Sequence, residues 1–248
     1  MDSNRMARNE CGLLTGISLP VLLILLLAVA ARERNVSWLD GIVLWQQAIA
    51  GAPNKARPYV NLAAELINAK RSSEAIAPLQ RAVSMDPAYY DAYDELAMAY
   101  QDLGLFSAAV VNAKKAIELD PASERAYIRL GIAAARLGDR REATEAFSAA
   151  LARDPMSVSA LINLGNERML ANDLAGASRF YGKALEIDPS HATVLYDLGM
   201  LEERQGDTAA AIAWYEAALR MRPDYGNAQR NLDALRSRPA PRQGGTGR

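Results

Sequence analysis

Residues 124–157 read ERAYIRLGIAAARLGDRREATEAFSAALARDPMS, and they contain the pattern from which the fold can be predicted. Its apolar and small residues recur at intervals of three and four in each half, which is the spacing of one face of a helix. Gly138 separates the halves and accepts the left-handed backbone that ends many helices. Asp139 with Glu142 is typical of the capping box that begins the next helix. The stretch therefore predicts two helices joined by a tight turn.

The same pattern recurs every 34 residues along most of the chain. It defines five blocks, 56–89, 90–123, 124–157, 158–191 and 192–225. The prolines that punctuate them are Pro53, Pro87, Pro121, Pro155, Pro189 and Pro223. Leucine holds position 7 of every block, and Ala or Gly holds positions 8, 20 and 27. A single helical hairpin cannot bury both of its faces, so we expect the blocks to stack into an all-α solenoid.

These columns resemble the tetratricopeptide repeat (TPR), whose pattern is W-x2-L-G-x2-Y, then A-x3-F, then A and P. The resemblance covers residues 56–225 and departs from the pattern at three positions. Arg168 and Glu202 hold position 11, where an apolar residue is usual, and Lys70 holds the turn position usually taken by Gly. We expect Arg168 and Glu202 to pair across the interface between repeats.

Helices are also predicted beyond both ends of the array. Residues 32–55 contain Trp38 and Trp45 at helical spacing and in phase with a second helix, which predicts a juxtamembrane capping helix. An alternative for Trp38 is a place in the aromatic belt of a membrane interface. Residues 226–237 continue the phase as a C-terminal capping helix, and residues 238–248, rich in Pro, Gly and Arg, predict a disordered tail.

The N-terminal region predicts a membrane anchor. After a short tail, 1–11, residues 12–31 run for twenty positions without a charge, and a helix of that length rises about 30 Å, enough to span a bilayer. The alternative is a cleavable signal peptide, because Ala28 and Ala30 form an A-x-A site. We favour an uncleaved signal-anchor because the apolar run exceeds the usual length of a signal core.

The orientation of this anchor is not decided by charge, because two arginines flank it on each side. The A-x-A site and the absence of cysteine after Cys11 favour export of the C-terminal part. We therefore expect a single-pass protein whose repeats lie outside the cytoplasm, on the periplasmic side of a bacterial inner membrane.

Composition excludes several classes of function. The 28 Lys and Arg balance 29 Asp and Glu to a net charge of −1, which does not favour nucleic acid as a partner. One Cys and one His cannot build a structural zinc site. Phosphate-binding glycine motifs and catalytic constellations are also absent from the sequence, so we expect no enzyme, no metal and no cofactor.

The resemblance implies that a protein or peptide binds along the concave face, at positions 2, 5, 9, 12 and 13 of the first helices. The predicted contact residues are Asp91, Asp94, Met98, Arg125, Ile128, Ile132, Ile162, Asn166, Met169, Tyr196 and Met200. The aspartates favour a basic end of the ligand, and the apolar members a hydrophobic segment. An alternative is that some apolar members only pack against the neighbouring repeat. The basic clamp for acidic C-terminal tails found in some relatives is missing, because no Lys holds position 5.

The predicted function is a membrane-tethered scaffold or adaptor that assembles protein complexes of the cell envelope. The alternative is an accessory subunit of a glycan-processing or glycosyl-transfer apparatus. That alternative depends on residues 44–63, which are similar to the segment after the last membrane helix of protein O-mannosyltransferase-like proteins that carry such repeats. The sequence makes no prediction of oligomeric state.

Overall fold

The structure, a computed structural model, describes residues 41–237 of the 248 in the chain. These residues form twelve α-helices and no strand, which confirms the predicted all-α repeat array. The predicted membrane segment 12–31 lies outside the described residues, as do residues 1–11, 32–40 and 238–248. Among the helices of the described part, none has both the length and the apolar character needed to cross a membrane.

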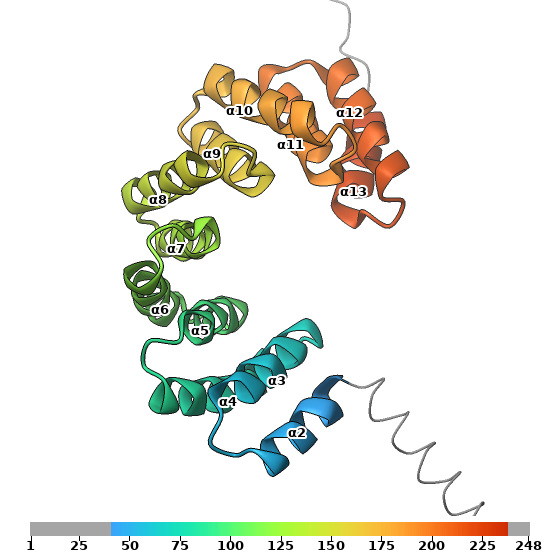
Figure 1. Ribbon diagram of the computed structural model, residues 1–248. Helices are drawn as coiled ribbons and strands as arrows, with labels where there is room; N and C mark the ends of the chain where they lie inside the picture. The colour runs from blue at the N-terminus through green and yellow to red at the C-terminus, as the bar shows by residue number, and fades with distance from the viewer. Residues whose placement is uncertain (1–40, 238–248) are drawn as a thin grey trace, which may run out of the picture. The chain divides into compact units, whose positions relative to one another are not determined.

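The described residues fall into two units, divided between Pro87 and Ala88. The first unit contains α2 (Gly41–Gly51), α3 (Ala56–Asn68) and α4 (Ser72–Met85). The second contains α5 (Tyr90–Asp102), α6 (Phe106–Leu119), α7 (Glu124–Leu137), α8 (Arg140–Arg153), α9 (Val158–Leu170), α10 (Leu174–Ile187), α11 (Ala192–Gln205), α12 (Thr208–Met221) and α13 (Gly226–Ser237). Within the second unit, α5, α7, α9 and α11 line the inner side of a curve, and α6, α8 and α10 lie outside them (Figure 1).

Each hairpin turns at a residue with left-handed backbone, at the position where the sequence predicts it. Gly138 has a φ of 85° at the end of α7, and Asn172 has a φ of 61° at the end of α9. Lys70 also has a φ of 61°, although it is neither Gly nor Asn. A side chain with a Cβ costs free energy in this region, so the α3–α4 turn is formed at some strain.

The aspartate that precedes the proline of a block ends the second helix. The Oδ1 atom of Asp154 accepts a hydrogen bond from the Met156 N–H at 2.9 Å, and Asp188 Oδ1 accepts from the Ser190 N–H at 3.0 Å. Asp120 makes the equivalent bond two residues along the chain. This Asx turn gives a hydrogen-bond partner to a backbone N–H just after the end of the helix. The proline between the two residues cannot continue the helix.

The predicted capping box at α8 forms only in part. Asp139 Oδ1 accepts from the Glu142 N–H at 2.9 Å, as expected of an N-cap. The reciprocal bond is not made, because the Asp139 N–H donates to the Ala134 carbonyl, and Glu142 Oε1 lies 2.7 Å from Lys114 Nζ instead. The side chain at N3 is therefore used to join neighbouring hairpins.

The two helices of the late hairpins pack through a glycine and an aromatic ring. A Cβ atom added at Gly165 would lie 2.4 Å from Cε1 of Tyr181, a residue with 0% exposure. The same close approach joins Gly131 with Phe147 at 2.4 Å and Gly199 with Tyr215 at 2.5 Å. Glycine at position 8 thus lets the ring at position 24 contact the backbone of the first helix.

Each unit has a terminal helix outside the five blocks. In the second unit, Leu232 and Leu235 of α13 are buried and pack against Tyr215. In the first unit, α2 packs on α3, and Trp45 on α2 is half-buried. These helices cover the apolar faces that the terminal hairpins would otherwise expose.

Candidate functional site

The predicted contact residues all lie on the first helices of the second unit, on a surface that we name the inner surface. Asp91, Asp94 and Met98 belong to α5, Arg125, Ile128 and Ile132 to α7, Ile162, Asn166 and Met169 to α9, and Tyr196 and Met200 to α11. These helices share the inner side of the unit's curve (Figure 1). Their side chains differ in accessibility, and this decides which of them a ligand can touch.

Two carboxylates of α5 are paired with arginines of α7. Arg125 Nε lies 2.8 Å from Asp94 Oδ2, and Arg125 Nη2 lies 3.5 Å from Asp91 Oδ1. Arg129 Nε lies 3.8 Å from Asp94 Oδ2, and Arg129 also donates to the Met98 sulfur at 3.0 Å. Arg125 and Arg129 therefore neutralise the acidic positions, and the two helices are joined by charge.

Asp94 cannot contact a ligand in this arrangement, because its exposure is 0%. Burial raises the pKa of the Asp94 carboxyl, and the charges of Arg129 and Arg125 oppose that rise. The prediction that Asp94 presents an acidic surface to a basic peptide end is therefore wrong, because stacking of α7 on α5 covers it. Asp91 keeps half of its side chain exposed but shares Arg125.

Ile128 and Met169 are also corrected as contact residues. Ile128 is 8% exposed and belongs to a core cluster with Leu164 of the next hairpin. Met169 is 4% exposed and belongs to a cluster with Leu201 of α11. For these two residues the alternative, packing against the neighbouring repeat, describes the structure. Burial of these two side chains stabilises the stacking of the hairpins.

Three predicted apolar residues keep accessible surface. Ile132 on α7, Ile162 on α9 and Met200 on α11 are only partly buried, each resting with one side on a core cluster. Leu170, at the end of α9, is 59% exposed. These side chains give the inner surface an apolar strip on consecutive first helices, and such exposed apolar area is typical of a binding surface.

Two polar residues of the predicted set have structural partners. Asn166 Oδ1 accepts a hydrogen bond from the Tyr181 hydroxyl at 2.6 Å. The Tyr196 ring lies 5.6 Å from the ring of Tyr215, centroid to centroid, and the Tyr196 hydroxyl accepts from Asn231 Nδ2 at 3.3 Å. Tyr196 thus connects α11 to the terminal helix, and a change there would also disturb α13.

Sequence reasoning missed Asp197, a buried carboxyl on α11. Asp197 is 5% exposed, and in the described part of the chain its Oδ2 atom has no hydrogen-bond partner. Burial raises the pKa of Asp197 from 3.8 to about 7. Its sequence signal is a carboxylate at i+3 from Val194 and i−4 from Leu201, two residues with 0% exposure. A charged residue within a buried apolar stripe needs a partner or a proton.

The accessible side chains of the inner surface suit the binding of a polypeptide. Among the residues that the structure describes, no group of three or more His, Cys, Asp or Glu side chains could hold a metal ion. Asp197 stands near Tyr181, whose pKa is raised chiefly by burial and further by the Asp197 charge. The accessible features are apolar side chains flanked by paired charges, which suit a polypeptide ligand.

Sequence profiles described as tetratricopeptide repeat match residues 56–89, 90–123, 128–190 and 162–226. Together these ranges cover more than half of the chain. The chain belongs to the tetratricopeptide repeat family. The first two matched ranges coincide with the first two blocks of this TPR array, and the other two overlap within the late repeats.

Several solved TPR structures resemble this TPR protein. YrrB, described as a TPR protein with an unusual peptide-binding site, is 21% identical with a TM-score of 0.56 over 76% of this chain and 97% of its own. PilF of Pseudomonas aeruginosa is 15% identical with a TM-score of 0.65 over 84% of this chain and 94% of its own. A chain of the Cut9–Hcn1 hetero-tetramer of the APC/C is 20% identical with a TM-score of 0.72, and the match covers 82% of this chain and 40% of that chain. At these identities the likeness establishes the fold alone. No curated protein matches the chain significantly.

Proposed function

We propose that this TPR protein is a membrane-tethered scaffold that binds an extended or helical segment of another protein along its inner surface. The observation that carries the proposal is the apolar strip of Ile132, Ile162, Leu170 and Met200, which keeps accessible surface on three consecutive first helices. Peptide binding by the TPR protein YrrB supports this kind of ligand.

The structure changes the chemistry expected of the partner. Arg125 pairs with both Asp91 and Asp94, so the α5 end of the inner surface is not a free acidic site. The partner segment is therefore expected to present apolar side chains to α7, α9 and α11, and its charge to matter less. Burial of apolar area at the centre of an interface usually contributes most of the affinity.

The proposal includes a membrane anchor and a location in the cell. The uncharged residues 12–31 would anchor the chain in a bacterial inner membrane, with the repeats on the periplasmic side and an envelope complex as the partner. Protease added to intact spheroplasts is expected to degrade the repeats. Protection of the repeats until the cells are lysed would place them in the cytoplasm and contradict the periplasmic part of the proposal.

Site-specific photo-crosslinking tests the binding surface itself. A photo-reactive amino acid placed at Leu170 or Met200 of the full chain is expected to capture one defined partner in cells, identified by mass spectrometry. Val111 on α6 is the matched control, because it is apolar and 67% exposed but lies on a second helix. Equal capture from Val111, or none from Leu170 and Met200, would show that the partner does not bind the inner surface.

A further inference from the structure

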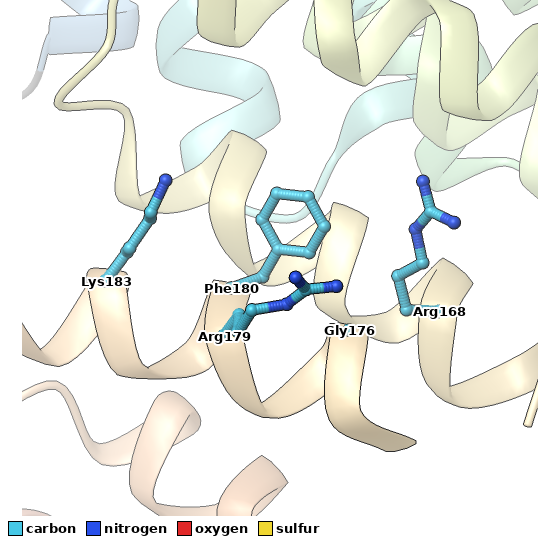
Figure 2. Close-up of a pocket in the computed structure, with 5 residues that line it drawn as sticks. All are labelled: Arg168, Gly176, Arg179, Phe180 and Lys183. Carbon is cyan, nitrogen blue, oxygen red and sulfur yellow. The ribbon is translucent and has the colours of Figure 1, made fainter. Parts of the chain in front are cut away.

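A pocket of about 270 Å³ lies on the fourth repeat, away from the predicted contact residues. It is lined by Arg168 of α9 and by Gly176, Arg179, Phe180 and Lys183 of α10, and we name it the basic pocket. In Figure 2 the four side chains extend to the same side of the helices, with Lys183 and Arg168 at the two ends and Phe180 and Arg179 between them. The volume suffices for several waters or one group of phosphate size.

The positive charge of the basic pocket is poorly balanced. Arg168 was expected to pair with Glu202, but the structure places its Nη1 atom 3.7 Å from Asp173 Oδ2 of the same hairpin. Arg179 and Lys183 are exposed, and neither has an ion pair or a side-chain hydrogen bond in the part of the chain that the structure describes. Three cations thus lie near one carboxylate, that of Asp173, in a chain whose net charge is only −1.

The adjoining pocket shows what balanced charge looks like in this fold. It shares Arg168 and is lined by Arg140, Arg141, Thr144, Glu167 and Ala171. There, Arg140 Nε lies 3.1 Å from Glu167 Oε2, and Arg141 Nε lies 2.9 Å from Glu145 Oε1. Arg140 and Arg141 are thus paired within the protein, whereas in the basic pocket only Arg168 has an ion pair within the described residues, with Asp173, and Arg179 and Lys183 are left to bind an external anion.

The basic pocket contains residues that differ from those at the same positions of the other blocks, and only the fourth block has them together. Arg168 holds position 11, where the other blocks have Leu66, Tyr100, Ala134 and Glu202. Arg179 holds position 22, where the other blocks have Ala77, Val111, Glu145 and Ala213. Gly176 at position 19 has no side chain, so the Asp173 carboxylate can lie against it, where a Cβ atom would stand. None of these is a position of the concave clamp, so the basic pocket is distinct from the inner surface.

We propose that the basic pocket binds the phosphate of a small phosphate monoester. Two guanidinium groups and one ammonium group match a dianion with three acceptor oxygens, because each guanidinium can donate two parallel hydrogen bonds. A monocarboxylate would leave most of this positive charge unpaired. The half-buried Phe180 ring offers an apolar contact to the organic part of the ester.

The test is isothermal titration of the full chain, purified in a non-ionic detergent, with phenyl phosphate, inorganic phosphate and benzoate. Phenyl phosphate is expected to bind, inorganic phosphate more weakly and benzoate most weakly. Arg179→Gln and Lys183→Gln should each weaken phenyl phosphate binding by about tenfold or more, the scale of one lost charge-assisted hydrogen bond. Both residues are exposed, and circular dichroism checks that each variant keeps its helices.

The matched control is Arg81→Gln, because Arg81 holds the same repeat position as Lys183 and is exposed in the first unit. It is expected to leave binding unchanged. An equal loss of binding in Arg81→Gln would show non-specific charge attraction and overturn the proposal. Equal affinity for benzoate and phenyl phosphate, or no binding of either, would also overturn it.

A lipid headgroup is the other source of phosphate, and a second measurement separates it. Proteoliposomes of phosphatidylcholine with and without phosphatidylglycerol are treated with an amine-reactive reagent, and modification of Lys183 is compared with that of Lys70. The monoester proposal expects phenyl phosphate to protect Lys183 and phosphatidylglycerol to have no effect. Protection by phosphatidylglycerol alone would assign the basic pocket to the membrane surface and overturn the proposal.

Discussion

The first two repeats and the last three solve the same packing problem with different residues. In repeats one and two, position 8 is Ala, and position 24 is Leu79 or Ala113. In repeats three to five, position 8 is Gly and position 24 is Phe or Tyr, with the ring against the glycine backbone. The residues at positions 8 and 24 are therefore matched in size: a larger side chain at position 24 occurs with a smaller residue at position 8.

The late repeats also begin their second helices differently. Asp139, Asp173 and Asp207 each accept a hydrogen bond from a backbone N–H of the first turn. The equivalent residue of the second repeat is Leu105, whose side chain cannot accept one. The late repeats thus combine ring packing with capping, and we expect them to be the more stable part of the array.

The strongest test of the size match between positions 8 and 24 replaces both residues of the fourth repeat with those of the first repeat. Gly165→Ala should destabilise the chain by about 1–3 kcal/mol, because the new methyl group meets the Tyr181 ring. Tyr181→Leu should also destabilise it. The double variant recreates the Ala63–Leu79 pair of the first repeat and should cost less than the sum of the singles by about 0.5–3 kcal/mol. Urea unfolding followed by circular dichroism measures all three.

Gly182→Ala is the control for this series, because it lies on the same helix and a Cβ there would meet nothing within 4 Å. It should stabilise the chain by about 0.5–1 kcal/mol, as Ala does relative to Gly in a helix interior. Strict additivity of Gly165→Ala and Tyr181→Leu would mean that the two columns are independent, and the comparison between early and late repeats would lose its basis.

Buried carboxylates give a second contrast between the two ends of the second unit. Asp94 has arginines beside it, whereas Asp197 has burial alone and a pKa raised to about 7. Because the folded state holds this proton more tightly than the unfolded state, stability should fall as pH rises from about 4 to about 7. Asp197→Asn removes this loss and should be more stable than the wild type at pH 8 by about 1–3 kcal/mol.

Thermal unfolding of wild type and Asp197→Asn between pH 4 and 9 measures this difference. The two stability curves should diverge as pH rises, with the wild type below the variant. Asp224→Asn, an exposed change in the same unit, serves as the control for the loss of one carboxylate. Parallel curves for wild type and Asp197→Asn would mean that Asp197 is hydrated or paired when it is ionised.

The hairpins, their turns and most of their caps could be predicted because they depend on residues close in sequence. Gly138, Asn172 and Asp139 act within one turn of the chain, so their spacing suffices. The half-formed capping box shows the limit of this reasoning. The expected local partner of Glu142, the Asp139 N–H, donates to the Ala134 carbonyl, and Glu142 pairs with Lys114 of the preceding hairpin, which only the stacking of hairpins brings near.

The candidate site was predicted less well, because it depends on how far each first helix is covered by the next. The repeat positions place Asp94, Ile128 and Met169 on the inner surface, yet neighbouring hairpins bury all three. In the sequence, Arg168 and Arg179 differ from the residues at the same positions of the other repeats, but nothing there indicates that they share a pocket. That depends on the rotation of α9 against α10, which no local pattern encodes.

The smallest expected effects come from exchanging the caps of early and late repeats. Leu105→Asp should stabilise the chain by about 0.5–2 kcal/mol, because the carboxylate can accept from the first-turn N–H groups of α6 and removes an apolar side chain that is 52% exposed. Asp207→Ala should destabilise it by a similar amount, since Ala210 N–H loses its partner at 2.9 Å. Both changes are measured by urea unfolding, with Asp224→Asn as the control. If Leu105→Asp gave no gain while Asp207→Ala kept its cost, the backbone at Leu105, with ψ of 60° against 84° at Asp207, would be unsuited to a side-chain cap. The difference between the repeats would then lie in the path of the chain and not in the choice of residue.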